Sequence, residues 1–210
     1  NDDESYTLRN AIVTAAIINM FINNSDTIGM ANYSTFVNIN GAISVKSDGI
    51  VERPQYHVFD LLSNNTGDVL YQTIVKGETF SIKMPQSPRL GRDVRNINLV
   101  NPESENKGLS KINYLSVAST GDDDGYLYVS IVNRHLEKDL DAEIIFETTH
   151  LSVEGEASYI IFNDDVKAFN TKENPDNVTI KTADKPFVSG NICKFTAKKH
   201  SINLLKFKVN

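Results

Sequence analysis

The sequence predicts a mostly β protein in which an antiparallel β-sandwich follows a short α/β segment. Two observations carry this prediction. Up to about residue 66, apolar residues recur at helical spacing between short strand-like runs, whereas from residue 67 their period changes to two. Turn signals such as Glu154-Gly155 and Asn174-Pro175-Asp176 then divide the chain into short segments, as in a sandwich. We therefore predict an α/β part over residues 1–66 and a β-sandwich domain over residues 67–210.

The first predicted element is a helix from roughly Ser5 to Asn23. Ser5 can cap its first turn, and the acidic residues 2–4 lie near the positive end of its dipole. Apolar residues cover most of its circumference, which is typical of a buried helix. Polar residues interrupt the run well short of the ~20 apolar residues of a membrane span. We expect this helix to have neighbours on several sides.

The rest of the α/β part is predicted to contain one short strand and a second helix. The strand covers residues 26–31, residues 32–40 have no clear pattern, and Ser47-Asp48-Gly49 marks a turn. The helix begins near Pro54, which suits a first turn, and Gly67 suits the left-handed position after it. Two such units cannot close a barrel, which takes about 250 residues. We therefore expect this part to be the end of a larger domain.

Nine strands are expected in the second part, separated by turn signals. The last of them alternates cleanly, with Leu205 and Phe207 on one face and Lys206 on the other. Residues 85–110 are predicted to form a long loop. The predicted strands are Asp68–Val75, Phe80–Met84, Tyr114–Ser119, Tyr126–Asn133, Asp139–Glu147, Ala157–Phe162, Val178–Thr182, Ile192–Thr196 and Ser201–Val209.

Composition excludes several classes of partner. The formal net charge is −6 and acidic and basic residues are mixed along the chain, so no basic stripe is available for a nucleic acid. No basic amphipathic helix of the membrane-surface type occurs in the sequence. The chain begins at Asn1 without Met or a signal peptide, so we expect it to start inside a larger protein, with a cytoplasmic location favoured. The one cysteine, Cys193, is expected to be a small buried residue of a strand.

The sequence offers no pattern for a metal or a cofactor. His57 lies among apolar residues of the second helix and is interpreted as a buried structural histidine, and the other histidines have no second ligand at zinc spacing. Asp122-Asp123-Asp124 lies between two glycines and is interpreted as a solvated hairpin turn, because calcium loops alternate their ligands over a longer stretch. We expect no cofactor and no metal site.

Two acids and two tyrosines are the remaining candidates for carbohydrate chemistry. Retaining glycosidases need a carboxylate pair about 5–5.5 Å apart. Glu52 and Asp60 are the acids of the α/β part after its first helix, but they lie before and on the second helix, away from strand ends, and are interpreted as surface or capping residues. Tyr126 and Tyr128 share a strand face, which suits either a sugar-binding platform or packing inside a sandwich, and packing is favoured.

Three stretches of the chain carry a family resemblance. The first runs from Leu8-Arg9-Asn10-Ala11 to Asn19-Met20-Phe21 and on to Met30-Ala31-Asn32; the second runs from Val37-Asn38 to Arg53-Pro54 and into Tyr56-His57-Val58-Phe59-Asp60; the third joins Val129–Asn133 to Phe169-Asn170 and Glu173–Val178. Together they resemble retaining α-L-arabinofuranosidases of glycoside hydrolase family 51. The resemblance covers nearly the whole chain apart from the predicted loop.

The resemblance implies a (β/α)₈ barrel followed by a β-sandwich, of which this chain would hold the last barrel elements and the sandwich. The family's acid/base and nucleophile glutamates have no counterparts here and would lie upstream, so no residue of this chain is expected to be catalytic. Asn32 and Thr35 are expected to line the substrate site of the intact enzyme, although many members have Gln where Thr35 stands.

The implied activity is release of terminal α-L-arabinofuranosyl groups from arabinan, arabinoxylan and oligosaccharides by a homo-oligomer. An arabinose-containing saccharide would then be the partner, with no nucleic acid and no membrane. The alternative is a free-standing β-sandwich that binds carbohydrate or has a structural role without hydrolysis. The absence of Trp and the two predicted N-terminal helices argue against it.

Overall fold

The computed structural model describes residues 5–83, 109–147 and 152–210. They form two compact units, of which the smaller spans Lys76–Tyr114. In the smaller unit β4 (Thr79–Lys83) pairs antiparallel with β5 (Leu109–Asn113), and the Phe80 ring centroid lies 4.8 Å from that of Tyr114. The predicted loop over residues 85–110 lies mostly outside the described residues, and its last two residues belong to β5.

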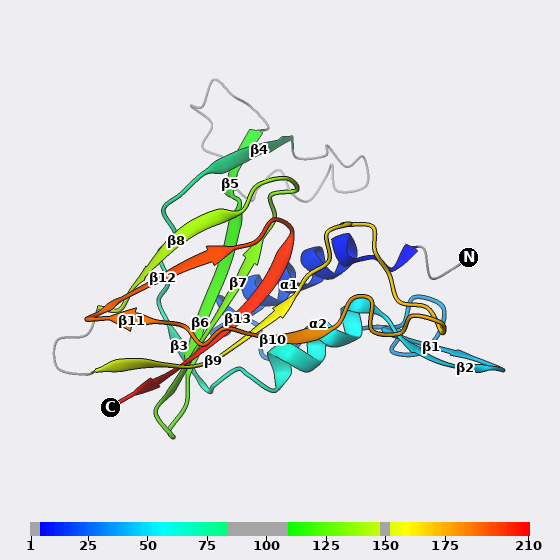
Figure 1. Cartoon of the computed structure of the whole chain (residues 1–210), viewed down its shortest axis with the longest axis horizontal. Helices are drawn as coiled ribbons and strands as arrows, with labels where there is room; N and C mark the ends of the chain where they lie inside the picture. Colours follow the sequence, from blue (N-terminus) through cyan, green and yellow to red (C-terminus); the bar gives the residue numbers. More distant parts are fainter. Residues whose placement is uncertain (1–4, 84–108, 148–151) are drawn as a thin grey trace. The chain divides into compact units, whose positions relative to one another are not determined.

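The larger unit is built around a six-stranded antiparallel sheet (Figure 1). Each neighbouring pair of its strands is antiparallel, which confirms the predicted antiparallel, mostly β class. The bounds predicted for β7 and β13 are those observed. The strand order is β10 (Ile180–Ala183), β9 (Val153–Ile161), β13 (Ser201–Val209), β7 (Tyr126–Asn133), β6 (Leu115–Gly121) and β3 (Val69–Tyr71).

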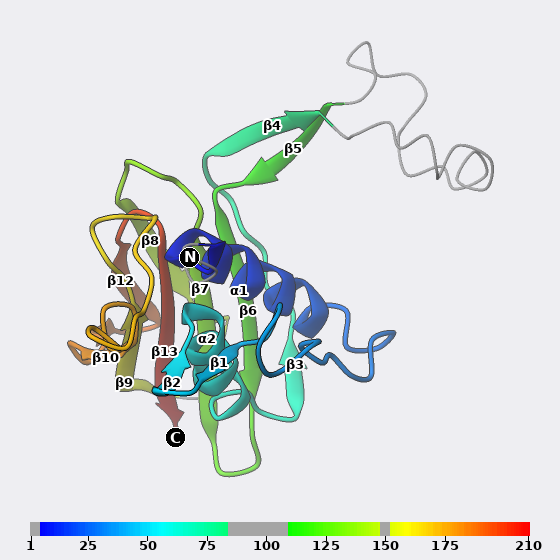
Figure 2. The ribbon, with the colours of Figure 1, turned by 90° about the vertical axis from the view of Figure 1, so that its right-hand side faces the viewer.

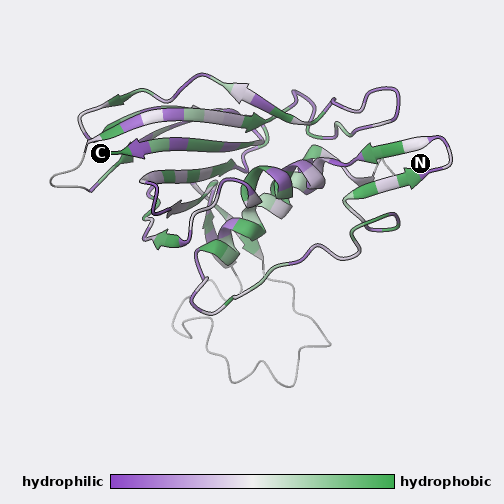
Figure 3. Cartoon of the chain, turned by 90° about the horizontal axis from the view of Figure 1, so that it is seen from below, coloured by the Kyte–Doolittle hydropathy of each residue, from purple (hydrophilic) through white to green (hydrophobic). Residues whose placement is uncertain are grey.

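A three-stranded sheet covers one face of this large sheet. It has the order β11 (Val188–Ser189), β12 (Ile192–Ala197) and β8 (Leu140–Ile145). Between the two sheets lies an apolar core that includes Cys193, buried as predicted, and an edge-to-face pair of Phe146 and Phe207 with ring centroids 5.0 Å apart. The sandwich therefore has a core of its own. Apolar and polar residues alternate along its strands (Figure 3), so that the apolar side chains of each strand share one face.

Two helices cover the opposite face of the large sheet (Figure 2). They are α1 (Leu8–Ile22) and α2 (Pro54–Ser63), close to the predicted bounds. The helices and the sheet share one apolar core. Its buried residues are Leu8, Ala11, Ile12, Ala15, Val58, Leu61, Leu62, Tyr128, Val132, Ile161, Ala168, Val178, Ile202 and Leu204.

The predicted alternation along β13 is confirmed. Leu205 and Phe207 enter the core between the sheets, whereas Ile202 and Leu204 enter the core beneath the helices. All four side chains are at most 1% exposed. A strand that is buried on both faces and hydrogen-bonded on both edges, to β7 and β9, ties the three layers together.

Side-chain amides connect the helical layer to the sheet. Asn19 of α1 is fully buried and its Nδ2 donates to the backbone oxygen of Ser116 at 3.0 Å. Asn170, from the loop before β10, donates through Nδ2 to the backbone oxygens of Glu52 and Val178. Because buried polar groups are costly unless paired, these bonds favour one position of α1 on β6 and of the end of β2 on the segment before β10.

The outer side of α1 differs from the prediction. Only one of its faces is covered by described residues, and the opposite face leaves Val13, Ile17 and Met20 between 42% and 55% exposed. The expectation of neighbours on several sides is therefore not met within the described part of the chain. Thr7, rather than Ser5, is the N-cap residue, so the cap lies two residues after the predicted position.

Two further local predictions are corrected. No strand forms over residues 26–31: residues 24–28 make a turn through Asn24, and no described strand lies alongside to supply hydrogen bonds. Gly67 does not adopt the left-handed conformation predicted for it after α2, and the C-cap residue of the helix, Asn64, lies in the αR region. Gly67 instead lies so close to Gly121 that a Cβ atom would be 2.1 Å from the Gly121 backbone oxygen.

A short hairpin lies between the helices in sequence. β1 (Ile43–Lys46) pairs with β2 (Gly49–Glu52) around the predicted turn, and the prediction contained neither strand. β2 leads directly into α2, whose first residue is Pro54 as predicted.

His57 of α2 is buried as predicted, at 5% exposure. Its Nδ1 lies 3.4 Å from Thr179 Oγ1, while no described polar atom is within hydrogen-bonding distance of its Nε2. Burial lowers the pKa of His57, and the negative charges of Glu52, Asp60 and Asp176 oppose that shift. The folded protein therefore favours the neutral ring.

The pairing of Phe207 with Phe146 generates a stability prediction. Phe207→Ala should lower the free energy of unfolding by about 3–5 kcal/mol, because it removes a fully buried ring and leaves a cavity. Urea unfolding followed by circular dichroism measures the change. The matched control is Phe187→Ala, at a side chain that is 79% exposed, where the expected change is within about 0.5 kcal/mol. Equal losses at the two positions would contradict the assigned core.

The neutral His57 generates a pH prediction. Its folded-state pKa lies below the ordinary value of 6.5, so the unfolded chain takes up a proton first as the pH falls. The contribution of the neutral His57 ring to the free energy of unfolding should be complete above about pH 6.5 and should decline as the pH falls below that value. His57→Gln should remove this part of the acid dependence in unfolding curves recorded between pH 7.5 and 5. If His57→Gln and the wild-type protein lose the same free energy of unfolding between pH 7.5 and 5, the protonation of His57 does not change on unfolding.

Candidate functional site

The two residues expected to line a substrate site lie on an irregular segment between α1 and β1. Asn32 and Thr35 both have exposed side chains. Between them Tyr33 is half-buried, and its ring meets that of Phe59 edge-on with centroids 5.5 Å apart. Burial raises the pKa of Tyr33, reinforced by Tyr6 and opposed by the positive charge of Arg53. Tyr33 therefore holds the segment against α2 while its neighbours face outward.

A tight turn follows this segment and returns the chain to β1. The Asn38 N–H donates to the Ile43 backbone oxygen, and the Asn38 side-chain oxygen accepts from the Val45 N–H, both at 2.7 Å. Asn38 adopts φ of 56°, a left-handed conformation that Asn tolerates well. At Gly41 a Cβ atom would be 2.6 Å from the Phe36 oxygen, so no larger residue fits. Local sequence thus determines the shape of this turn.

Arg53 closes the turn from the other side. It is 2% exposed, and its Nη1 donates to the Gly41 backbone oxygen at 2.7 Å and lies 3.4 Å from that of Ile39. Its guanidinium carbon lies 3.6 Å from the centre of the Tyr6 ring, whose hydroxyl donates to the Ile39 oxygen and to Asn40. The guanidinium thus lies between an aromatic face and a set of backbone carbonyls.

The acids considered as a catalytic pair are surface residues. Glu52 and Asp60 are both exposed, at the end of β2 and on α2. The Asp60 carboxylate accepts from Asn64 Nδ2 at 2.7 Å, which places it at the helix end as a local capping partner. Their interpretation as surface or capping residues agrees with these positions.

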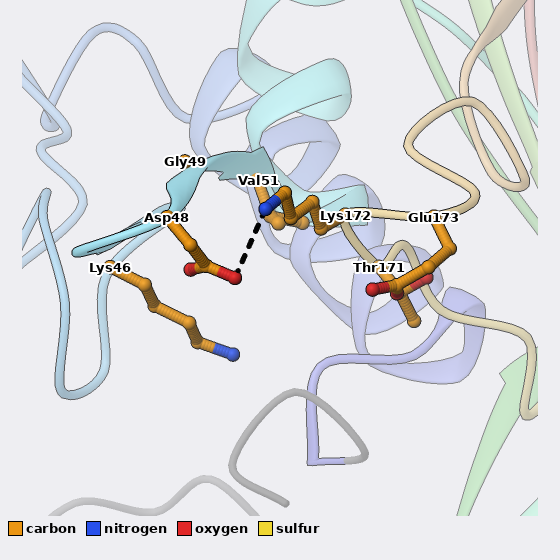
Figure 4. A pocket seen from close by; sticks show the side chains of 7 residues that line it. All are labelled: Lys46, Asp48, Gly49, Val51, Thr171, Lys172 and Glu173. Carbon is orange, nitrogen blue, oxygen red and sulfur yellow. Dashed lines mark hydrogen bonds and ion pairs between the residues drawn. The ribbon is translucent and has the colours of Figure 1, made fainter.

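A shallow pocket of about 220 Å³ lies between the β1–β2 hairpin and the loop that follows Asn170 (Figure 4). Lys172 reaches across it to Asp48, with 3.2 Å between Nζ and Oδ2. Because lysines and acids alternate around the opening, the pocket has no consistent charge with which to select an ion. Its lining residues are Lys46, Asp48, Gly49, Val51, Thr171, Lys172 and Glu173.

The tyrosine pair is covered rather than open. Tyr128 is 9% exposed and belongs to the core beneath the helices, and its hydroxyl donates to Asp122 at 2.8 Å. The Lys206 ammonium lies 3.8 Å from the centre of the Tyr126 ring. Asp122 lies in the predicted hairpin turn between β6 and β7, and its other oxygen accepts from the Tyr126 N–H. These contacts support the packing interpretation of the pair.

Sequence reasoning missed Tyr6 and Arg53. Tyr6 lies in the predicted cap region of the first helix, and Arg53 was read only as the residue before Pro54. No local signal distinguishes Arg53 from its neighbour Glu52, which also lies between Val51 and Pro54 but is exposed.

Over residues 5–83, 109–147 and 152–210, no group of three His, Cys, Asp or Glu side chains is placed to hold a metal ion. Neither described helix has the length and apolar character of a membrane span.

Comparison with known proteins identifies relatives of this chain. A family model described as the α-L-arabinofuranosidase C-terminal domain matches residues 1–201. The probable α-L-arabinofuranosidase C of Aspergillus niger is 26% identical over 207 residues, which are 99% of this chain and 36% of that protein. The α-L-arabinofuranosidase C of Emericella nidulans is 25% identical over 98% of this chain and 36% of its own length. This chain thus spans little more than a third of these relatives.

Solved structures have the same fold as this chain. The α-L-arabinofuranosidase of Thermotoga maritima, solved as an arabinose complex, is 26% identical with a TM-score of 0.75, covering 96% of this chain and 38% of that one. The thermostable family 51 enzyme of Thermotoga petrophila is 25% identical with a TM-score of 0.76, covering 98% and 39%. The match extends through the helices, the large sheet and the small sheet alike. This chain belongs to the α-L-arabinofuranosidase C-terminal domain family.

Proposed function

We propose that this chain is the C-terminal part of a retaining α-L-arabinofuranosidase that removes terminal arabinofuranosyl groups from arabinan, arabinoxylan and their oligosaccharides. The single observation that carries the proposal is the family match over residues 1–201. The catalytic glutamates are proposed to lie in the part of the relatives' length that this chain does not span. The chain alone is therefore proposed to be inactive, since its acids Glu52 and Asp60 are exposed surface residues.

The family resemblance also suggests a separate structural role for each of the two parts of the chain. Residues 1–66 are proposed to complete a (β/α)₈ barrel, and residues 67–210 to form the sandwich that supports it. Two features of the first part favour this. The apolar outer face of α1 is uncovered, and Met30 and Ile39 on the segment after it are 78% and 81% exposed. A barrel would bury these residues and give the predicted strand over residues 26–31 its partners.

Asn32 and Thr35 are proposed to line the sugar site of the intact enzyme. Both are polar and exposed, and the segment that carries them is held at Tyr33 and at the turn after it. An exposed polar pair on a fixed backbone is suited to hydrogen-bond the hydroxyls of a sugar. No cofactor is part of the proposal.

A carbohydrate-binding module without hydrolysis is the weaker candidate. Its sugar-binding platform would be Tyr126 and Tyr128. However, Lys206 lies over the Tyr126 ring, and Tyr128 is buried in the core beneath the helices. The homo-oligomer that the resemblance implies stays a prediction, which sedimentation of the full-length protein tests.

The first test of the proposed function compares two proteins in parallel. Hydrolysis of 4-nitrophenyl α-L-arabinofuranoside should be rapid with the full-length gene product and absent with this 210-residue chain. Release of 4-nitrophenol measures both rates. Activity in the short chain would overturn the upstream location of the catalytic glutamates, and Glu52→Gln and Asp60→Asn would then be the first variants to examine. A full-length protein that is inactive on arabinofuranosides would refute the proposed activity.

The uncovered face of α1 generates a second test. Ile17→Lys should change the stability of the isolated chain by less than about 0.5 kcal/mol, because Ile17 is 42% exposed there. In the full-length protein the same change should cost more than about 2 kcal/mol, because a lysine would be buried against the barrel without a partner. Urea unfolding of both proteins measures the two effects. Equal small effects would show that nothing covers this face of α1.

A further inference from the structure

We propose that Arg53 and Tyr6 are positioning residues for the substrate-lining segment of the proposed enzyme. They act through the turn at residues 36–43, which fixes the backbone on which Asn32 and Thr35 lie. The inference rests on the proposed function, because the substrate role of Asn32 and Thr35 belongs to it. Neither positioning residue is proposed to touch the sugar.

The first step of the argument is the burial of a cation among carbonyls. Arg53 is 2% exposed, and its Nη1 points at the backbone oxygens of Gly41, Ile39 and Asn38 at 2.7, 3.4 and 3.5 Å. A guanidinium out of water is costly unless its donors are used. Those carbonyls come from the turn and not from α2, which Arg53 precedes. These contacts tie the buried guanidinium to the shape of the turn.

Tyr6 supplies the second contact to the same turn. Its ring lies 3.6 Å from the guanidinium carbon, and its hydroxyl donates to the Ile39 oxygen, which Arg53 Nη1 also approaches. The hydroxyl also lies 3.2 Å from Asn40 Oδ1. The turn is thus contacted by two side chains from outside it, one before α1 and one before α2. Each of these two side chains bonds to a backbone carbonyl that lies outside the described strands and therefore has no partner strand to donate to it.

The turn transmits its position to the substrate-lining residues over a short distance in sequence. The Ile43 N–H donates to the Phe36 oxygen at 3.1 Å, and Phe36 is adjacent to Thr35. On the other side of Thr35, Tyr33 contacts Phe59 of α2. Asn32 and Thr35 lie on or beside a stretch that is held at Phe36 and at Tyr33, and the contact at Phe36 depends on the turn. A displacement of about 1 Å in a site can cost a factor of 100 in rate, so small shifts of the turn matter.

A mild variant tests this without unfolding the protein. Tyr6→Phe keeps the ring under the guanidinium and removes only the hydroxyl. In the full-length enzyme it should lower kcat/KM on the aryl arabinofuranoside by roughly tenfold, with an unchanged circular dichroism spectrum. Arg53→Lys, which loses the planar donor group, should lose at least as much. The matched control is Tyr71→Phe in β3 of the sandwich, at a tyrosine that is 52% exposed, where activity should stay at the wild-type level.

A double-mutant cycle separates positioning from general destabilisation. If Tyr6 acts through the segment, Tyr6→Phe should have little further effect in an Asn32→Ala background, where the placed side chain is gone. Hydrogen exchange on the 210-residue chain adds a readout without activity. The amides of Asn38, Ile43 and Val45 should exchange roughly tenfold faster in Tyr6→Phe, while that of Leu204 in the central strand is unchanged.

Two results would overturn the inference while leaving the proposed function intact. The first is that the Tyr6→Phe and Arg53→Lys enzymes have the same kcat/KM as the Tyr71→Phe control. The other is a loss that multiplies fully with that of Asn32→Ala, together with unchanged exchange at Asn38. A wild-type enzyme without arabinofuranosidase activity would instead refute the proposed function, and the exchange measurement would still decide whether the two residues hold the turn.

Discussion

The structure depends on one strand that is buried on both of its faces. β13 contributes Ile202 and Leu204 to the core beneath the helices, and Leu205 and Phe207 to the core between the sheets. It also pairs along both edges, so it is the element through which the helical layer and the small sheet are coupled. Removing either core would leave an apolar face of this strand exposed to water. The three layers are therefore expected to fold cooperatively rather than as separable shells.

The sequence was informative wherever a local pattern and the tertiary contacts agreed. The alternation of Leu205, Lys206 and Phe207 predicted the correct faces of β13, and Pro54 located the start of α2. The prediction failed where a partner decided the outcome. Residues 26–31 have the composition of a strand, but no described strand is available to pair with them. Gly67 lies where a glycine commonly ends a helix. Glycine is instead needed there because the backbone of Gly121 passes too close for a side chain, and no local pattern in the sequence reveals that contact.

The candidate site was predictable to a similar degree. Asn32 and Thr35 came from a resemblance, and the structure adds that both are exposed on a held segment. The contacts that hold this segment could not be predicted from the sequence, because Tyr6 bonds to a carbonyl 33 positions away and Arg53 to one 12 positions away. Such a cluster involves backbone acceptors, which have no residue-type signature. The same holds for Asn170, whose side chain joins Glu52 to the sheet across 118 positions.

The central place of β13 also has a consequence for the order of synthesis. Among the described elements the strand that completes both cores is translated last, while α1 is translated first. At ribosomal rates of about 5–20 residues per second, roughly 10 to 40 s separate the emergence of α1 from that of β13. During that interval Leu8, Ala11 and Ile12 lack the strand against which they finally pack. The apolar face of α1 is therefore exposed to aggregation until β13 has been synthesised. We expect chaperones to bind this part of the nascent chain during translation.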